Sequence, residues 1–298
     1  MSVASALRLI LLAALWGASF LFLRLSVASM EPAWLITFRV GVAAVFLSAV
    51  ALFTKRQFDW KAHKVELLVL GVLNGAIPFV CYALAAKTLT ASLMSILNAT
   101  APIWGTLLAV IFMRQRPGLK ALAGLLLGIT GVAILVGLDK VSAKPGAGMA
   151  ILASLVATFC YGLASVYTRM KVRGIASFDM AHGSMWAATL VLLPFLLWIP
   201  APLAIAISPI VAVAVLGLGV LCTGLAFLIY FRLIQDIGPA STLTVTFLIP
   251  VFGILWGVLF LGESVGSNTF AGAALVLLGT ALATGFSPGA LWVKKAQA

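Results

Sequence analysis

The sequence predicts an all-α membrane protein whose ten transmembrane helices form two inverted five-helix repeats. Hydrophobic residues make up 63% of the 298 residues and charged residues only 9%, which leaves too much apolar surface for a soluble globule. Ten apolar stretches each approach the ~20 residues that a helix needs to cross a bilayer, and they form two similar groups of five. Because five is odd, the second group starts on the opposite side of the membrane and lies in the opposite orientation.

The predicted spans leave only short connections between them. They cover residues 6–28, 33–53, 65–86, 91–112, 118–138, 148–169, 179–199, 208–231, 239–261 and 268–286. Residues 1–138 are assigned to the first repeat, 139–147 to an outer linker and 148–290 to the second, inverted repeat. The longest loops are too short for a soluble catalytic domain, and the first span is interpreted as retained because no clear small-residue cleavage site follows it.

The repeat is visible residue by residue. At a constant offset of 148, four residues of the first half recur in the second, as the pairs Pro102 and Pro250, Gly105 and Gly253, Gly124 and Gly272, and Gly131 and Gly279. An offset of 145 aligns Trp16, Gly17 and Arg24 with Tyr161, Gly162 and Arg169. The glycines of the fifth and tenth spans have the spacing that allows close backbone approach, so we expect these two spans to pack rather than to contact substrate.

The net charge of +12 is explained by membrane orientation rather than by nucleic acid, since no basic groove or arm is apparent. With a cytoplasmic N-terminus, the outer loops hold only Lys87, Lys140 and Lys144. The inner segments hold Arg8, Lys55, Arg56, Lys61, Lys64, Arg114, Arg116, Lys120, Arg169, Lys171, Arg173, Arg232, Lys294 and Lys295. This bias predicts a multi-pass protein of the inner (plasma) membrane with both termini cytoplasmic.

Two prolines predict where the helices are irregular. Pro102 and Pro250 lack an N–H group and free the carbonyls four residues earlier, at Asn98 and Thr246. At membrane depth, a free carbonyl is tolerated where it is buried in protein or faces a wet cavity. The fourth and ninth spans are therefore predicted cavity walls; the alternative is a kink that serves packing alone.

Polar and aromatic side chains recur at helical spacing on six spans, and we expect them to line a central cavity. For each single aromatic residue, interhelical packing is the alternative. The predicted substrate-binding residues are Trp16, Ser19, Asn74, Pro78, Tyr82, Ser95, Asn98, Pro102, Tyr161, Ser165, Thr223, Phe227, Thr246 and Pro250.

Two arginines, Arg24 and Arg39, fall near the outer ends of the first two spans. They could form a basic vestibule with Glu31 as a partner, which would attract a carboxylate or phosphate. Alternatively, they extend to the outer headgroups and Glu31 neutralises one of them. His182, four residues from Trp186, is interpreted as a hydrogen-bonded structural residue.

All seven acidic residues fall in loops or near span ends, so no carboxylate relay is expected at the membrane midplane. Transport down a gradient without obligatory ion coupling is therefore favoured. Three cysteines, Cys81, Cys160 and Cys222, show no metal-ligand spacing. No cofactor, metal ion or catalytic residue is expected, and the absence of a matched nucleophile and base argues against an intramembrane enzyme.

The first span contains Trp16-Gly17-Ala18-Ser19-Phe20, and each half has a mid-helix proline followed by a loop and a glycine-rich final helix. In the second half the loop carries Leu261-Gly262-Glu263. With these features, nearly the whole chain resembles the drug/metabolite transporter superfamily, in its ten-helix branch of paired EamA-type repeats. The first half departs from the pattern, because Gln115 stands where the acid of the Gly-Glu pair would fall.

The resemblance implies a cavity lined by spans 1, 3, 4, 6, 8 and 9, with spans 5 and 10 peripheral. It is closest to the aromatic amino-acid exporters of the YddG type, which implies export of bulky apolar amino acids and related metabolites by alternating access. A multidrug exporter of lipophilic cations is the alternative, and a membrane scaffold or receptor is least favoured. Nucleotide-sugar and triose-phosphate carriers use basic residues inside the cavity, and none is expected here. The expected partners are a small-molecule substrate and the lipid bilayer, and the protein is expected to be a monomer.

Overall fold

The computed structural model describes residues 2–56, 60, 62–114, 118–138, 144–200 and 208–285. Within these residues every regular element is helical. Eight helices have at least 18 residues and are apolar enough to cross a membrane, and two shorter apolar helices complete the set. The predicted all-α membrane fold with ten spans is confirmed.

In the first repeat, the third and fourth spans are not regular α-helices throughout. The third span runs through a π-helical segment, η1, and Ala99 and Thr100 interrupt the fourth. The elements are α1 (Val3–Ser26), α2 (Pro32–Phe53), α3 (Lys64–Leu70), η1 (Gly71–Ala76), α4 (Ile77–Ala86), α5 (Ala91–Asn98), α6 (Ala101–Met113) and α7 (Leu119–Leu138).

The second repeat has the same irregularities in its third and fourth spans. Its eighth span contains the π-helical segment η5, and the ninth is interrupted at Leu243 and Thr244, so that α13 starts six residues after the predicted start at 239. The elements are α8 (Ala147–Lys171), α9 (Ser177–Leu192), the 3₁₀ segment η3 (Leu193–Trp198), α10 (Pro209–Leu216), η5 (Gly217–Leu225), α11 (Ala226–Ile237), α12 (Pro239–Thr242), α13 (Val245–Leu261) and α14 (Ser267–Thr284).

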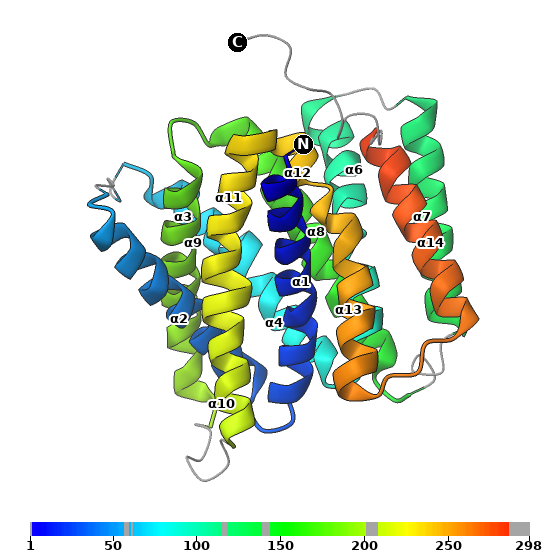
Figure 1. The fold of residues 1–298 in the computed structure, drawn as a ribbon, viewed down its shortest axis with the longest axis horizontal. Coiled ribbons are helices and arrows are strands. Elements are labelled where there is room, and N and C mark those ends of the chain that lie inside the picture. The colour runs from blue at the N-terminus through cyan, green and yellow to red at the C-terminus, as the bar shows by residue number, and fades with distance from the viewer. Residues whose placement is uncertain are drawn as a thin grey trace.

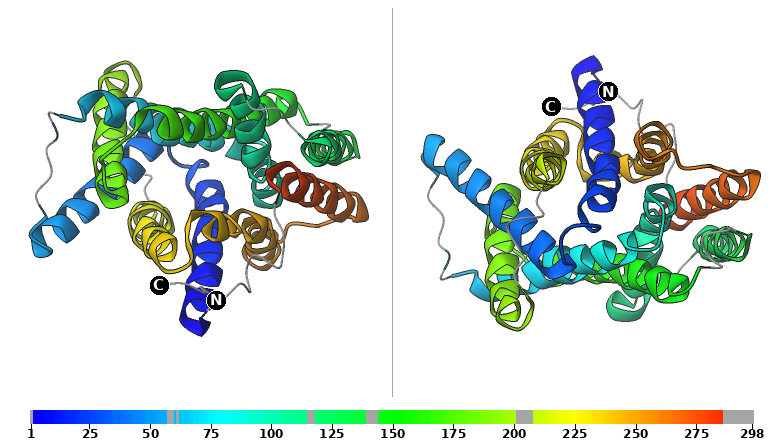
Figure 2. Two further views of the ribbon diagram at one scale, coloured as in Figure 1. Left: turned by 90° about the horizontal axis from the view of Figure 1, so that it is seen from above. Right: turned by 90° about the horizontal axis from the view of Figure 1, so that it is seen from below.

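The helices form one bundle in which α1 begins at the end where α14 finishes (Figure 1). Five crossings separate the start of α1 from the start of α8, so the two repeats are inverted. Viewed along the bundle, α1 stands between α11 and α13, and α7 and α14 lie side by side at the edge (Figure 2).

Glycine contacts hold the first helix of each repeat against the fourth span of the other. A Cβ atom on Gly17 of α1 would lie 2.9 Å from the backbone nitrogen of Gly253 in α13. A Cβ atom on Gly162 of α8 would lie 2.8 Å from the backbone nitrogen of Gly105 in α6. These glycines are the equivalent residues of the two halves, so the same contact occurs twice with the roles exchanged, as an inverted repeat requires.

The peripheral spans α7 and α14 also meet through glycines. A Cβ atom on Gly124 would lie 2.6 Å from the carbonyl oxygen of Gly279, and one on Gly272 would lie 3.0 Å from that of Gly131. Such distances leave no room for a side chain. The expected packing role of these glycines is therefore confirmed.

The fourth span of each repeat ends in a left-handed backbone conformation. Gly262 follows α13 with φ 62°, and Arg114, its equivalent at an offset of 148, follows α6 with φ 52°. Glycine adopts this conformation at little cost, whereas a residue with a Cβ atom is disfavoured by about 1–2 kcal/mol. The arginine in place of glycine therefore leaves the path of the backbone unchanged but lowers the stability of the protein.

Replacement of Arg114 by glycine should raise the thermal midpoint of the purified protein, with a gain of about 1 kcal/mol in the free energy of unfolding. The matched control is Arg114→Ala, which removes the same charge but keeps a Cβ atom. If the glycine variant melts no higher than the alanine variant, the left-handed backbone at Arg114 does not lower the stability of the protein.

Replacement of Gly162 by alanine should separate α8 from α6, because the new methyl group would contact the backbone of Gly105. Overpacking of this kind costs about 1–3 kcal/mol. Gly148→Ala on the same helix is the control, since no atom lies within 4 Å of the added Cβ. Equal melting temperatures for the two variants would contradict the proposed crossing.

Candidate substrate site between the repeats

Both third spans contain a π-helical segment that starts at a glycine. Gly71 begins η1 and Gly217 begins η5, 146 residues later. A Cβ atom on Gly71 would lie 2.7 Å from the carbonyl oxygen of Ser184, and one on Gly217 would lie 2.9 Å from the Phe22 ring, so each glycine permits a close helix contact. A π turn has one residue more than an α turn and redirects the side chains that follow it, and such turns often occur at functional sites.

The fourth span breaks beside Asn98, where α5 ends. Pro102 has no N–H group for the Asn98 carbonyl, as the sequence predicts. The hydroxyl of Thr280, on α14, donates to the carbonyl oxygen of Ala99 at 2.8 Å. A side chain of the second repeat thus satisfies the open backbone of the first.

In the ninth span the interruption lies four residues earlier than the equivalent position. Pro250 lies inside α13, and the turn is at Leu243 and Thr244. The Thr246 hydroxyl donates to the carbonyl oxygen of Leu243 at 2.8 Å, which is a local back-bond typical of threonine. The expectation of matching irregular backbone at Asn98 and Thr246 is therefore met only in the first repeat.

Tyr82 and Asn98 form the polar contact at the break. The Tyr82 hydroxyl, on α4, donates to Oδ1 of Asn98 at 3.1 Å. The Tyr82 side chain is buried, and its ring lies edge-on to Phe20 of α1 with 5.4 Å between centroids. Spans 1, 3 and 4 therefore meet around one phenol and one amide.

Arg39 extends from α2 into the middle of the bundle. Only 5% of the residue is exposed. Its Nε donates to the Thr223 hydroxyl at 3.1 Å, and its guanidinium carbon lies 3.7 Å from the ring centroid of Phe79. Thr223 is central in the span Pro209–Ile237, so the guanidinium lies near mid-span depth.

Tyr161, on α8, is half-buried. It packs against the hydrophobic core to which Phe79 and Tyr82 also belong. On the other side of α1, the rings of Trp16 and Tyr230 lie with centroids 5.5 Å apart. The centre therefore combines phenol, amide, hydroxyl and guanidinium groups with aromatic faces, and its members come from both repeats.

The structure brings some of the predicted binding residues together and leaves others apart. Those that take part in the central contacts are Trp16, Tyr82, Asn98, Tyr161 and Thr223. Buried or half-buried residues on the same spans are Ser19, Asn74, Pro78, Pro102 and Phe227, and Pro250 is buried on the ninth span. Their roles in binding remain predictions.

Three predicted residues have other surroundings. Ser165 is exposed on α8, and the Thr246 hydroxyl donates to the carbonyl oxygen of Leu243. Ser95 fills the space beside Gly253, and its hydroxyl donates to the carbonyl oxygen of Ser92 at 2.8 Å. Helical spacing predicts the span on which each residue lies but not its immediate surroundings, and the binding roles of these three residues remain predictions.

Sequence reasoning missed Phe79, Cys222 and Tyr230 as members of the centre. Tyr230 follows Phe227 by three residues and Thr223 by seven, so the helical spacing already used for that span could have included it. Nothing in the sequence distinguishes Phe79 from the other seventeen of the 18 phenylalanines. Cys222 was interpreted as a packing residue, and it is buried in η5 directly before Thr223.

The two intramembrane arginines do not share a vestibule with Glu31. The Glu31 carboxylate pairs with Lys87, with 3.0 Å between Oε2 and Nζ. Arg24 lies in the last turn of α1, and its Nη1 donates to the carbonyl oxygen of Ala86 at 2.8 Å. Arg39 lies inside the bundle, which overturns the expectation that no basic residue lies there. The sequence misplaced it because span position alone does not show which way a long side chain points.

His182 belongs to a separate hydrogen-bonded group between α2 and α9. Its Nε2 lies 2.8 Å from the Ser48 hydroxyl, which also accepts a hydrogen bond from Nε1 of Trp186 at 2.9 Å. The Trp60 ring lies edge-on to the imidazole. These contacts agree with a structural role for this histidine.

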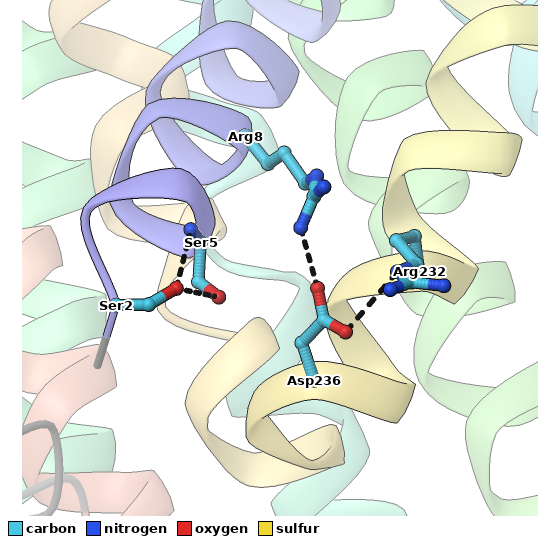
Figure 3. Close-up of polar contacts among 5 residues, drawn as sticks. All are labelled: Ser2, Ser5, Arg8, Arg232 and Asp236. Atoms are coloured by element: carbon cyan, nitrogen blue, oxygen red, sulfur yellow. Dashed lines mark hydrogen bonds and ion pairs between the residues drawn. The ribbon is translucent and has the colours of Figure 1, made fainter.

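Ion pairs join the repeats at the end of the bundle where the chain begins. Arg8 Nη1 of α1 lies 2.6 Å from Oδ2 of Asp236, and Arg232 Nε lies 3.1 Å from Oδ1 of the same carboxylate (Figure 3). Asp236 and Arg232 are one turn apart on α11. One carboxylate therefore connects α1 to α11.

At the opposite end, a carboxylate of the second repeat caps a helix of the first. Glu263 accepts hydrogen bonds from the backbone N–H of Ala91 at 2.7 Å, the N–H of Ser92 at 3.0 Å and the Ser92 hydroxyl at 2.7 Å. The Thr90 hydroxyl accepts the next N–H, of Leu93, at 3.1 Å. These bonds satisfy donors that a helix start leaves open, and they link the loop after α13 to α5.

Among the described residues, no group of three or more His, Cys, Asp and Glu side chains could hold a metal ion. The central residues are aromatic, amide, hydroxyl and guanidinium groups. This arrangement can bind a small polar solute with an apolar part.

A model of the EamA-like transporter family matches residues 4–137 and again residues 148–285. The chain belongs to this family. The two matches correspond to the two five-helix groups of the fold, and they identify the chain as a multi-pass membrane transporter.

Relatives of similar length extend the comparison. The chain is 21% identical over 269 residues to the uncharacterized transporter YoaV of Bacillus subtilis, with 89% of this chain and 91% of the relative covered. It is 26% identical over 279 residues to a probable terminal-alkyne amino-acid exporter of Streptantibioticus cattleyicolor, with 92% and 91% covered. A solved structure with 18% identity matches 95% of this chain and 97% of its own with a TM-score of 0.66, which supports the fold.

Replacement of Glu263 by alanine should lower the free energy of unfolding by about 2 kcal/mol, because hydrogen bonds to a charged group contribute about 1.5–3 kcal/mol. Glu31→Ala is the matched control, since the exposed pair with Lys87 should contribute little. Thermal denaturation of both variants in detergent measures the difference. Equal midpoints for the two variants would rule out the cap as a stabilising contact.

Proposed function

We propose that the chain exports amino acids with bulky apolar side chains by alternating access, without obligatory ion coupling. The observation that carries this proposal is the hydrogen bond from Tyr82 to Asn98 at the break of the fourth span, in an aromatic centre between the repeats. Polar groups at a break can hold the charged ends of an amino acid, while aromatic faces bury its side chain. The amino-acid exporter among the relatives, at 26% identity, agrees with this substrate class.

Alternating access would use the contacts at the two ends of the bundle. The pair Arg8–Asp236 joins the repeats where the chain begins, and Glu263 joins them at the opposite end. Opening toward one side breaks only the contacts of that side, while the glycine crossings between the repeats act as the pivot. The excess of basic residues in the inner segments supports placing both termini in the cytoplasm of a plasma-membrane protein.

The arrangement of the carboxylates supports transport without ion coupling. Of the acidic residues described, Glu31, Asp236 and Glu263 are held in contacts at the two ends of the bundle. Asp179 and Glu66 lie in the first turns of α9 and α3. None of these carboxylates is at mid-span, where a proton relay would use one.

Purified protein in liposomes should move labelled phenylalanine, and Tyr82→Ala should weaken its apparent affinity by roughly 5- to 100-fold. The reason is the loss of apolar burial, on the order of 1–3 kcal/mol for one aromatic side chain, together with the hydrogen bond to Asn98. Phe260→Ala is the control, because Phe260 is 65% exposed on α13. Flux down a fixed gradient should persist when a protonophore is added.

Three results would count against the proposal. Normal affinity in both Tyr82→Ala and Asn98→Ala would remove the proposed site. A block of flux by the protonophore would remove the uncoupled mechanism. Movement of lipophilic cations without any amino acid would favour the multidrug alternative.

A further inference from the structure

Arg39 is a buried charge that the described protein does not neutralise. Its Nε is bonded to the neutral hydroxyl of Thr223, and its guanidinium lies on the neutral ring of Phe79. No carboxylate among the described residues lies within 4 Å of it, and its two terminal nitrogens donate to none of those residues. An ionised side chain at this depth is costly and, in membrane proteins, normally has a partner.

Each described carboxylate interacts elsewhere. Glu31 pairs with Lys87 and Glu263 caps α5 at one end of the bundle, while Asp236 pairs with two arginines at the other. Asp179 and Glu66 lie in the first turns of α9 and α3, away from the middle of the spans. No carboxylate in the described part of the chain is therefore left to serve as the counter-ion of Arg39.

We propose that Arg39 binds the carboxylate of the transported solute, an inference that rests on the proposed amino-acid transport. Because Nε is held by Thr223, the two terminal nitrogens are left for one anion, and a guanidinium fork matches a carboxylate in a bidentate geometry. Phe79 and Thr223 fix the orientation of the fork. The π-helical segment η5 supplies Thr223, whose hydroxyl in turn donates to the carbonyl oxygen of Leu218 at 2.8 Å.

The surroundings of Arg39 define the rest of the solute. The Phe79 ring lies on the guanidinium and belongs, with Tyr82 and Tyr161, to one hydrophobic core, so aromatic surface adjoins the anion site. A solute with one carboxylate at one end and an apolar group at the other fits a guanidinium beside aromatic side chains. One guanidinium also matches one negative charge, and it repels lipophilic cations.

The competing account is a structural arginine that only ties α2 to η5 and α4. The two roles differ in their effect on stability. Removal of an uncompensated buried charge leaves the free energy of unfolding unchanged or raises it, whereas loss of a structural contact lowers it. A binding role also changes the preference between charged and neutral ligands, which a structural role does not.

The experiment uses the full chain in detergent and measures binding of labelled L-phenylalanine and labelled 3-phenylpropanoate. Competitors are L-phenylalaninamide, which lacks the carboxylate, and phenyl phosphate, which has a different anion. Wild-type protein should prefer phenylalanine to its amide by about 10- to 100-fold, as expected for a charged hydrogen bond, and should prefer 3-phenylpropanoate to phenyl phosphate. This comparison needs no variant, so it holds even where a substitution prevents folding.

Arg39→Gln should weaken phenylalanine binding by about 10- to 100-fold, leave amide binding unchanged and melt no lower than wild type. Arg39→Lys should keep part of the preference, because it retains the charge without the fork. Arg169→Gln, an exposed arginine at the end of α8, removes the same charge and should bind normally.

Four outcomes would overturn the inference. The first is equal wild-type affinity for phenylalanine and its amide, and the second is an Arg39→Gln variant that still prefers phenylalanine to the amide. The third is a parallel loss of acid and amide binding in Arg39→Gln together with a lower melting point. The fourth is a wild-type preference for phenyl phosphate over 3-phenylpropanoate. A wild-type protein that binds 3-phenylpropanoate through Arg39 but neither binds nor moves any amino acid would leave the carboxylate site standing. That result would refute the amino-acid function alone.

Discussion

A backbone hydrogen bond that is lost at membrane depth has to be replaced inside the protein, and this constraint decides where the spans can be irregular. Threonine hydroxyls supply such replacement hydrogen bonds. Thr280 donates to the carbonyl oxygen of Ala99, and Thr223 donates to that of Leu218. The π-helical segments and the breaks all occur in the third and fourth spans of each repeat, and Tyr82, Asn98 and Thr223 belong to these spans. The same constraint therefore determines which spans can form a polar centre.

The glycine crossings and the polar centre have complementary roles. Gly17 against Gly253, and Gly162 against Gly105, bring backbones so close that these helix pairs have no room for a solute. Nε1 of Trp256 on α13 also donates to the carbonyl oxygen of Ala14 on α1 at 3.0 Å. Larger side chains such as Tyr82 and Arg39 are buried elsewhere in the bundle. The repeats are therefore held together at two glycine crossings, which the proposed alternating access would use as its pivot.

The fold could be predicted closely from the sequence, because apolar length and a repeated ladder of glycines and prolines are properties of single helices. The site could be predicted only in part. The polar stripes identified Tyr82, Asn98, Tyr161 and Thr223, but Ser165 is exposed and Ser95 packs against Gly253. From its position along α2, Arg39 was expected either in a basic vestibule or at the outer headgroups. Its true position depends on Thr223, 184 residues away in the chain, and no periodicity within one helix contains that information.

The two ends of the bundle are not equivalent, although the repeats are. Glu263 caps α5 through the N–H groups of Ala91 and Ser92 and the Ser92 hydroxyl. At the offset of 148, the corresponding residues are Pro239, which has no N–H, and Ala240, which has no hydroxyl. Two of the three hydrogen-bond donors are therefore missing at Pro239 and Ala240. An acid in place of Gln115 would find fewer hydrogen-bond partners at these residues. That end is joined instead by Arg8 and Asp236, whose side chains are 39% and 20% exposed. Exposed ion pairs contribute little to stability, so under the proposed alternating access we expect the end where the chain begins to separate at lower cost.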